Sequence, residues 1–344
     1  MSSHAPIWRA AQALARSGTL GAMATVSRHR GSLPMAEDAK MVVAVDGQRW
    51  GTVGGGCTEA DVTDQALRAA RDGKPTFVQH TLNADLAGDL GLSCGGTVEL
   101  FLEPIVPLAE MAHLYGVVAD AIEQRVPATV YTAIEWGRGP AKIVRTPDSV
   151  TTVGASSNAT VDSASATHVP GASFVDEENN RFVEPVARLP RLVIFGAGHV
   201  GAQIARLAAN VGFYVVISDD RAEFANAEQV PWADETIAED FRTLLGRLVL
   251  DEDDYVLATT RGHAFDAAII ERTAASRARY VGMLGSRRKR EVIFKALADA
   301  GVPRAALDRV KVPIGEPIGA DTPAEIAVSV VAELIRLRRL GPTG

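Results

Sequence analysis

The chain has 344 residues, of which 47% are hydrophobic and 22% charged, a globular composition that excludes disordered acidic, collagen-like and coiled-coil chains. Its formal net charge of −7 argues against nucleic acid as the main partner, and without an apolar leader or a run of about 18 apolar residues we expect no membrane span. Two cysteines exclude a disulfide scaffold and fit a reducing, cytoplasmic location, while the length predicts about two domains.

The first part of the chain mixes helical and strand patterns. Helices are expected at 7–16, 58–71 and 107–124, and strands at 20–27, 41–45, 49–53, 77–82 and 97–103. Asp46-Gly47 between two of these strands predicts a hairpin, because a primed turn needs positive φ. Residues 150–173, rich in Ser, Thr, Ala, Gly and Asn, predict irregular strands and loops. We therefore expect a mixed α+β domain over residues 1–188.

From residue 191 onwards, apolar strands alternate with helices, which is typical of a parallel α/β sheet. Strands are expected at 192–195, 213–218, 255–259 and 280–284, and helices at 199–211, 265–277 and 287–300. A last helix is expected from Thr322, where Thr322-Pro323-Ala324-Glu325 forms a capping box. The pattern predicts a Rossmann-like, doubly wound parallel sheet over residues 189–344.

A G-x-G-x-x-G motif follows the first of these strands and opens a helix, with its glycines at Gly196, Gly198 and Gly201. Glycines here permit a tight turn and close backbone approach, and free N–H groups at the helix start suit a pyrophosphate. Asp219 or Asp220, at the end of the next strand, is placed to bind a ribose, and His199 lies near the same ligand. The motif predicts a site for NAD(P) or another nucleotide; a Rossmann fold with an empty or reused site, and a structural His199, are the alternatives.

Two polar loops follow later strands, and the first of them, after the strand at 255–259, is expected to face the same crevice. Arg261 is placed to pair with a phosphate, and His263 with Asp266 to bind or orient a ligand, unless this loop only caps a helix. In the second loop, Ser286 precedes four cations in the first turn of a helix, Arg287, Arg288, Lys289 and Arg290. The helix dipole disfavours positive charge at that end. A bound anion would compensate for that charge, although a solvated basic face is the usual explanation.

The two cysteines both lie in glycine-rich turns. Cys57 stands at a predicted helix start, where the dipole and the free N–H groups favour a thiolate, and Cys94 precedes Gly95-Gly96. The loop before Cys57 and the helix turn after it contain the further candidates Gly54, Gly55, Gly56 and Glu59. Lys40, just before the strand that leads to this loop, is either a second contact to the same anion or an exposed surface lysine. No HExxH or CxxC motif supports a resident metal site.

Several motifs together resemble the XdhC/CoxI family, the accessory proteins of xanthine dehydrogenase and related molybdenum hydroxylases. The resemblance covers nearly the whole chain, in order, and is carried by Gly31-Ser32-Leu33-Pro34, Ala39-Lys40-Met41, Gly51-Thr52-Val53-Gly54-Gly55-Gly56-Cys57-Thr58-Glu59, Cys94-Gly95-Gly96, the G-x-G-x-x-G segment, Thr260-Arg261-Gly262-His263, Gly282-Met283-Leu284-Gly285-Ser286-Arg287-Arg288-Lys289 and Ala320-Asp321-Thr322-Pro323-Ala324-Glu325.

This resemblance implies binding of the molybdenum cofactor, as molybdopterin or its dinucleotide form. Such a protein would hold the cofactor while its terminal sulfur is installed and then deliver it to the hydroxylase. A xanthine dehydrogenase-like hydroxylase, a cysteine desulfurase and a second copy of the chain are the implied partners. The chain would be a maturation chaperone and not a turnover enzyme.

The residues support the same hypothesis from their chemistry. Molybdenum is thiophilic, so Cys57 is a candidate for transient contact with the metal, while glycine loops and cations suit an anionic pterin. Two alternatives stay open. The glycine motif with Asp219 also fits an NAD(P)-dependent oxidoreductase, and a regulatory module that senses a nucleotide would use the same crevice.

Overall fold

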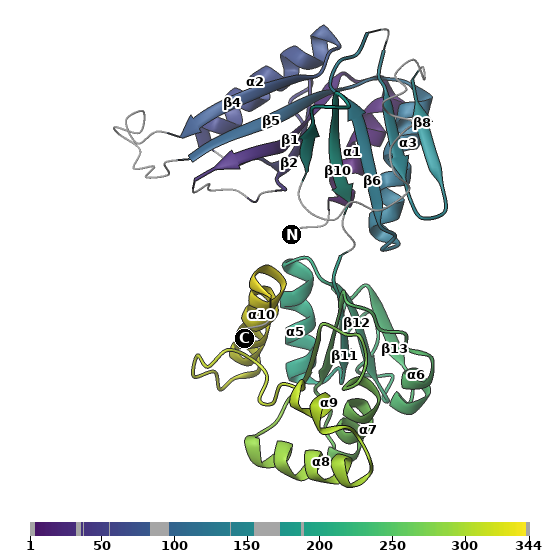
Figure 1. Ribbon diagram of the computed structural model, residues 1–344, viewed down its shortest axis with the longest axis vertical. Coiled ribbons are helices and arrows are strands. Elements are labelled where there is room, and N and C mark those ends of the chain that lie inside the picture. Colours follow the sequence, from purple (N-terminus) through teal and green to yellow (C-terminus); the bar gives the residue numbers. More distant parts are fainter. Residues whose placement is uncertain are drawn as a thin grey trace. The chain divides into compact units, whose positions relative to one another are not determined.

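The computed structural model describes residues 4–31, 36, 38–54, 56–82, 96–137, 139–154, 173–186 and 189–341, without the side chains of 56, 57 and 82. The chain forms two compact units, Ser3–Arg188 (unit 1) and Leu189–Gly344 (unit 2), and each is described by itself (Figure 1). No helix in the described part of the chain has the length and hydrophobicity needed to cross a membrane.

Unit 1 contains two antiparallel sheets and three described helices. The first sheet has the order β3-β2-β1-β5-β4, with β1 (Gly21–Arg30), β2 (Lys40–Ala44), β3 (Arg49–Thr52), β4 (Thr76–Leu82) and β5 (Gly96–Ile105). The second has the order β8-β7-β6-β10-β9, with β6 (Ala128–Ala133), β7 (Lys142–Arg145), β8 (Val150–Val153), β9 (Phe174–Asp176) and β10 (Arg181–Val186). The helices are α1 (Ala5–Ser17), α2 (Gly56–Asp72) and α3 (Ala109–Glu123).

Helices cover both faces of the first sheet. Side chains alternate between the faces of a strand, so Met23 packs with α1 and α3 in one core, whereas Ala22 and Ala24 pack with α2 in another. Because both faces are buried, β1 begins as a continuous apolar run instead of an alternating one. Strand β3, which precedes α2 in the chain, is an edge strand of this sheet.

Two buried ion pairs join the two sheets of unit 1. Lys40 on β2 bonds to Glu184 on β10 at 2.9 Å, and Lys142 on β7 bonds to Glu103 on β5 at 2.6 Å. Both ammonium groups also lie over the ring of Trp8, at 4.9 and 5.5 Å from its centroid. Buried charges are tolerated only when they are paired, so these contacts fix how the sheets face each other.

Unit 2 is a parallel sheet with helices on both faces. Its strand order is β13-β12-β11-β14-β15, with β11 (Arg191–Phe195), β12 (Tyr214–Asp219), β13 (Glu235–Ala238), β14 (Asp254–Ala258) and β15 (Tyr280–Met283). One core packs α5 (His199–Asn210) and α10 (Pro323–Leu340) on the sheet. The other packs α6 (Phe241–Arg247), α7 (His263–Thr273), α8 (Arg287–Asp299) and α9 (Arg304–Asp308). The predicted Rossmann-like sheet with a separate mixed domain is confirmed.

Local predictions are confirmed in several places and fail in others. The β2–β3 hairpin and the capping box of Thr322 with Glu325 are both present. The helix predicted over 265–277 instead begins at His263 and ends at Thr273, where the chain turns and the Ser276 N–H bonds to the Thr273 carbonyl. The segment 155–172 lies outside the described residues.

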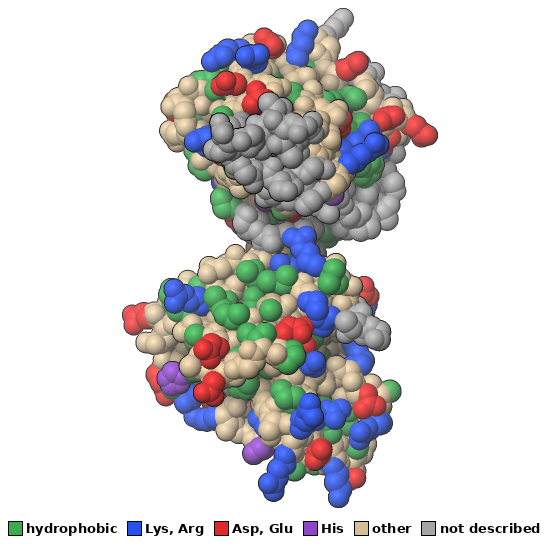
Figure 2. All heavy atoms as spheres, turned by 90° about the vertical axis from the view of Figure 1, so that its left-hand side faces the viewer, with side chains coloured by type: hydrophobic (Ala, Val, Ile, Leu, Met, Phe, Trp, Pro, Cys, Tyr) green, Lys and Arg blue, Asp and Glu red, His purple; other side chains and the backbone are tan. Residues whose placement is uncertain are grey.

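On unit 2, apolar side chains gather among scattered charges on the side that carries α10 (Figure 2). Val328 of α10 is 51% exposed, and Ile318 in the segment before this helix is 56% exposed. The helix therefore buries one stripe against α5 and leaves part of its apolar surface in solvent.

Candidate functional site

The candidate site is a crevice of about 200 Å³ at the carboxyl ends of β11, β12 and β14 in unit 2. Open α/β sheets bind ligands at this edge. The crevice lies where the strand order changes direction, since β12 and β14 lie on opposite sides of β11. Its lining comes from the glycine loop, the end of β12 and the loops after β14 and β15, namely Gly196, Gly198, His199, Val200, Asp219, Asp220, Arg221, Phe241, Thr259, Thr260, Arg261 and Leu284.

The three motif glycines have different roles. Gly196 has φ 109°, and a Cβ there would lie 2.6 Å from the Thr259 carbonyl oxygen. A Cβ on Gly201 would lie 1.9 Å from the Gly196 carbonyl oxygen, so this position lets α5 approach the loop closely. A Cβ on Gly198 would meet nothing within 4 Å. Of the three, Gly198 alone faces open space, as the position nearest an incoming phosphate must.

Asp219 holds the glycine loop instead of offering itself to a ribose. Its Oδ2 accepts from the Ala197 N–H at 2.9 Å and from Arg221 Nη2 at 3.2 Å, while Oδ1 accepts from Arg221 N at 3.1 Å and Nε at 2.9 Å. All four acceptor positions of the carboxylate are filled. Burial raises the pKa of Asp219, but the hydrogen bonds from Arg221 and Ala197 outweigh burial and leave it below the usual value. The expectation that Asp219 binds a ribose is corrected on this ground.

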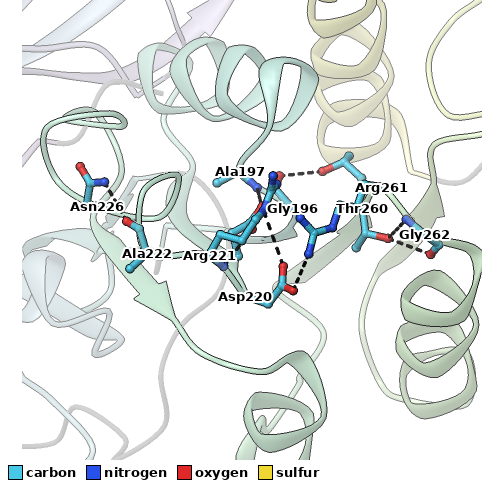
Figure 3. Close-up of polar contacts among 11 residues, drawn as sticks. Gly196, Ala197, Asp220, Arg221, Ala222, Asn226, Thr260, Arg261 and Gly262 are labelled. Atoms are coloured by element: carbon cyan, nitrogen blue, oxygen red, sulfur yellow. Dashed lines mark hydrogen bonds and ion pairs between the residues drawn. The ribbon is translucent and has the colours of Figure 1, made fainter.

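Asp220 and Arg261 face each other across the crevice. Asp220 follows β12 and Arg261 follows β14, the two neighbours of β11. Arg261 Nη2 donates to Asp220 Oδ2 at 2.9 Å, and Arg221 Nε lies 3.9 Å from Asp220 Oδ1 (Figure 3). The side chains of Asp220 and Arg261 are 23% and 52% exposed, so both can exchange partners with a ligand from solvent.

Lys289, one of the four cations at the start of α8, already has a carboxylate partner inside unit 2. Lys289 Nζ pairs with Asp266 Oδ2 at 2.5 Å and donates to the Leu284 carbonyl at 3.0 Å. Asp266 is fully buried and also accepts from the Thr260 hydroxyl at 2.8 Å. These contacts, which we call the loop latch, tie the loops after β14 and β15 together.

The positions of Ser286 and Arg287, the two candidates in this segment, are explained without a ligand. Ser286 caps α8, since its hydroxyl accepts from the Lys289 N–H at 3.2 Å. Arg287 is exposed, and neither residue lines the crevice. The predicted compensation of these cations by a ligand is therefore wrong for Lys289, whose charge Asp266 neutralises.

The two candidate histidines occupy different positions. His199 is the first residue of α5, is exposed and lines the crevice beside the glycine loop. His263 is the first residue of α7 and is exposed, but it does not line the crevice. The geometry thus keeps His199 and Arg261 at the candidate site and leaves His263 outside it.

The cysteine loop of unit 1 is described only in part. Gly54 has φ 127° and donates its N–H to the Thr52 hydroxyl at 3.3 Å. Glu59, in the first turn of α2, accepts from the same hydroxyl and lies 3.6 Å from Arg49. Glu59 therefore fastens α2 to β3, and its negative charge would oppose an anion there. Gly55, Cys94 and the side chain of Cys57, with Gly56 beside it, fall outside the description.

The position of Lys40 contradicts both expectations, that it contacts an anion and that it is an exposed surface lysine. It is 2% exposed, and its ammonium bonds to Glu184 and to the Thr25 hydroxyl inside unit 1. Burial lowers its pKa, and Glu184 opposes that shift by favouring the charged form. An anion could reach this ammonium only by displacing Glu184, so the anion contact is withdrawn.

A larger cavity of about 990 Å³ lies in unit 1. Its charged lining residues are Lys74, Glu110 and Glu135, which give it no preference for an anionic ligand. In the described ranges, no three His, Cys, Asp or Glu side chains are placed to hold a metal ion together. The crevice of unit 2 is therefore the better-formed candidate site for an anion.

Comparison with known families matches both units. The model of the XdhC and CoxI family matches residues 14–81, and that of the XdhC Rossmann domain matches residues 192–334. The chain belongs to the XdhC and CoxI family. The predicted membership is confirmed, and the second match coincides with the parallel sheet and its glycine loop.

Relatives of this XdhC-family chain extend over nearly its whole length. A Bacillus subtilis protein described as a probable subunit of xanthine dehydrogenase is 27% identical over 92% of the chain and 93% of the relative. A molybdenum cofactor insertion chaperone of Escherichia coli, PaoD, is 23% identical over 97% of the chain and 89% of its own length. A solved structure described as a xanthine dehydrogenase from Bacillus halodurans is 27% identical, with a TM-score of 0.78 over 100% of this chain and 97% of the other.

Sequence reasoning on this XdhC-family chain missed the residues that brace the crevice. Thr259 donates its hydroxyl to the Gly196 carbonyl at 2.9 Å, and Arg221 donates to the carboxylate of Asp219. The adjacency of Arg221 to two aspartates was the available signal. Nothing in the sequence distinguished Lys289 from the three neighbouring cations; in the structure its side chain packs beside Gly285, where a Cβ would lie 2.5 Å from the lysine Cδ.

Proposed function

We propose that this chain binds the molybdenum cofactor, as molybdopterin or its dinucleotide, and delivers it to a xanthine dehydrogenase-type molybdenum hydroxylase. It holds the cofactor while a partner cysteine desulfurase supplies the terminal sulfur, and it acts as a chaperone without turning over a substrate of its own. The observation that carries this proposal is the similarity to PaoD, a molybdenum cofactor insertion chaperone, over 97% of the chain. That range includes both units, so it includes both candidate loops.

The crevice of unit 2 is proposed to hold the phosphate and nucleotide end of the cargo. The N-terminus of α5 presents free N–H groups behind Gly198, where no Cβ blocks an approaching oxygen. Arg261 supplies an exposed guanidinium on the opposite side. An NAD(P)-dependent oxidoreductase is less favoured, because the similarity to a cofactor insertion chaperone extends over 97% of the chain.

Apart from the crevice in unit 2, the glycine loop before Cys57 in unit 1 is proposed as a separate contact for molybdenum. A thiolate is a suitable ligand for this thiophilic metal, and a helix start lowers the pKa of a cysteine thiol. Gly54, with its left-handed φ of 127°, turns the chain into this helix start. Cys57 would contact the metal transiently, and the cofactor leaves with the hydroxylase.

Retention of the cofactor tests this proposal. The chain is purified from cells that make the molybdenum cofactor, and bound pterin is measured as its fluorescent oxidation product alongside molybdenum by mass spectrometry. We expect the wild type to retain both, the Cys57→Ala variant to lose most of the molybdenum, and Arg71→Ala, at the other end of α2, to behave as wild type. Absence of pterin from the wild type would contradict the proposal, and equal retention by Cys57→Ala would remove this thiol from it.

The resemblance also implies a homodimer and a cytoplasmic location. We propose both as accompanying properties. Sedimentation equilibrium of the purified chain measures the first, and a mass of one chain at all concentrations would contradict it.

A further inference from the structure

The ion pair between Asp220 and Arg261 occupies the crevice where a nucleotide would lie. The two residues follow β12 and β14, on opposite sides of β11, so their 2.9 Å contact joins the loops on either side of β11 (Figure 3). The crevice that remains is about 200 Å³, smaller than the roughly 300–1,000 Å³ of common ligand pockets. A nucleotide bound against the glycine loop would therefore compete with this contact.

Both partners of the pair have chemistry that a ribonucleotide can satisfy. A phosphate matches the fork of the Arg261 guanidinium and competes with a carboxylate for it. Vicinal ribose hydroxyls donate to a carboxylate at the end of the second strand. Asp219, which stands one residue earlier, is excluded because its acceptor positions are filled. Asp220 is 23% exposed and keeps acceptor capacity beyond its single bond from Arg261.

We propose that Asp220 and Arg261 are the selectivity residues of this crevice, and that they exchange their mutual contact for the ribose hydroxyls and the phosphate of one ribonucleotide. The inference rests on the proposed binding of a nucleotide in unit 2. Free phosphate would satisfy Arg261 and leave Asp220 with only Arg221 at 3.9 Å, whereas a nucleoside would satisfy Asp220 and leave Arg261 without its carboxylate. Only a ligand that carries both ribose hydroxyls and a phosphate gives each of the two residues a new partner.

The test uses calorimetric titration of the full chain with ADP, CDP, their 2′-deoxy forms and the parent nucleosides. We expect the wild type to bind a ribonucleoside diphosphate about tenfold more tightly than its 2′-deoxy form, the loss expected for one hydrogen bond to a charged group. It is expected to bind the parent nucleoside more weakly still.

Two variants separate the roles of the pair. Asp220→Ala should lose the preference for the ribo form over the deoxy form, and Arg261→Ala should lose most of the preference for the diphosphate over the nucleoside. Asp299→Ala and Arg288→Ala, which replace exposed residues of α8 outside the crevice, are the matched controls. Thermal unfolding of each variant confirms that unit 2 stays folded.

Each outcome bears on the proposal differently. Ribo-form preference that survives Asp220→Ala, or diphosphate preference that survives Arg261→Ala, overturns the assignment while the crevice remains a nucleotide site. Failure of the wild type to bind ADP or CDP at millimolar concentration overturns nucleotide binding itself, and this inference with it. Loss of both preferences in the respective variants, with unchanged controls, supports it.

Discussion

Gly196, Gly198 and Gly201 belong to one motif but are required for different physical reasons. Gly196 needs its left-handed φ and lies against Thr259, whereas Gly201 gives space to the Gly196 carbonyl. Gly198 has neither constraint and is required only if something else approaches its backbone. The motif was predictable as a unit from the sequence, but this division of roles depends on distances that spacing alone does not provide.

Alanine substitutions at two of these glycines should therefore separate folding from binding. Gly201→Ala places a Cβ against backbone and should lower the free energy of unfolding of unit 2 by about 1–3 kcal/mol. Gly198→Ala should change it by no more than about 0.5 kcal/mol, yet weaken nucleotide binding. Urea unfolding and calorimetric titration measure the two effects, and equal destabilisation by both variants would contradict the assignment.

Asp219 should behave as a structural carboxylate that stabilises unit 2 when ionised. Its hydrogen bonds depress its pKa below the ordinary value of 3.8, so the native state binds fewer protons than the unfolded chain in acid. The stabilisation is complete above that value and is lost as the pH falls through the native pKa. Asp219→Asn should thus lower stability at pH 7 by about 1–3 kcal/mol.

The difference between wild type and Asp219→Asn should shrink as the pH falls below about 4, the ordinary range of an aspartate. Urea unfolding of both proteins over that pH range measures it, with Asp299→Asn as the exposed control. A difference that is constant with pH would show that ionised Asp219 does not brace the loop.

At the scale of elements, the loop latch explains two sequence motifs at once. Thr260 and Asp266 come from the loop after β14 and the start of α7, and Lys289 comes from α8. The buried carboxylate of Asp266 requires a partner, and Lys289, 23 residues later in the chain, provides it. In the sequence alone, the lysine looked like one of four equivalent cations.

Neighbouring substitutions on α8 test the latch. Lys289→Met leaves Asp266 buried without its counter-charge and should lower the free energy of unfolding of unit 2 by roughly 3–5 kcal/mol. Arg288→Met, one residue earlier and exposed, should change it by less than about 0.5 kcal/mol. Denaturant unfolding measures both, and similar effects of the two variants would show that the latch contributes nothing specific.

How well elements could be predicted depended on their burial. Strands β11, β12, β14 and β15 of unit 2 are mostly buried and were visible as short apolar runs, such as Leu192 to Phe195. The edge strand β13 is partly exposed and was not predicted. Strand β10 contains Arg181, Glu184 and Pro185, a composition that argues against an internal strand. It pairs with β6 along its whole length, and its Glu184 is matched by Lys40 from the other sheet. A contact between distant strands of this kind leaves no local pattern in the sequence.

At the scale of the molecule, each unit has cores of its own. Lys40→Met leaves Glu184 without its partner in unit 1 and should destabilise that unit by roughly 3–5 kcal/mol. Lys289→Met acts on unit 2 in the same way. We therefore expect each variant to shift a different unfolding transition, while the other transition keeps its midpoint.

Differential scanning calorimetry of the two variants and the wild type follows these transitions. The separate fragments 1–188 and 189–344 identify which transition belongs to which unit. A single transition that both variants shift equally would contradict independent folding of the units.

Delivery of the molybdenum cofactor is the central claim, and transfer from the loaded chain measures it most directly. Purified, cofactor-loaded protein is mixed with a cofactor-free xanthine dehydrogenase-type hydroxylase, and the pterin on each protein is followed together with hydroxylase activity. We expect pterin to leave this chain as it appears on the hydroxylase, and activation to be faster than with an equal amount of free cofactor. Pterin that stays on the chain, or activation no faster than with free cofactor, would contradict delivery.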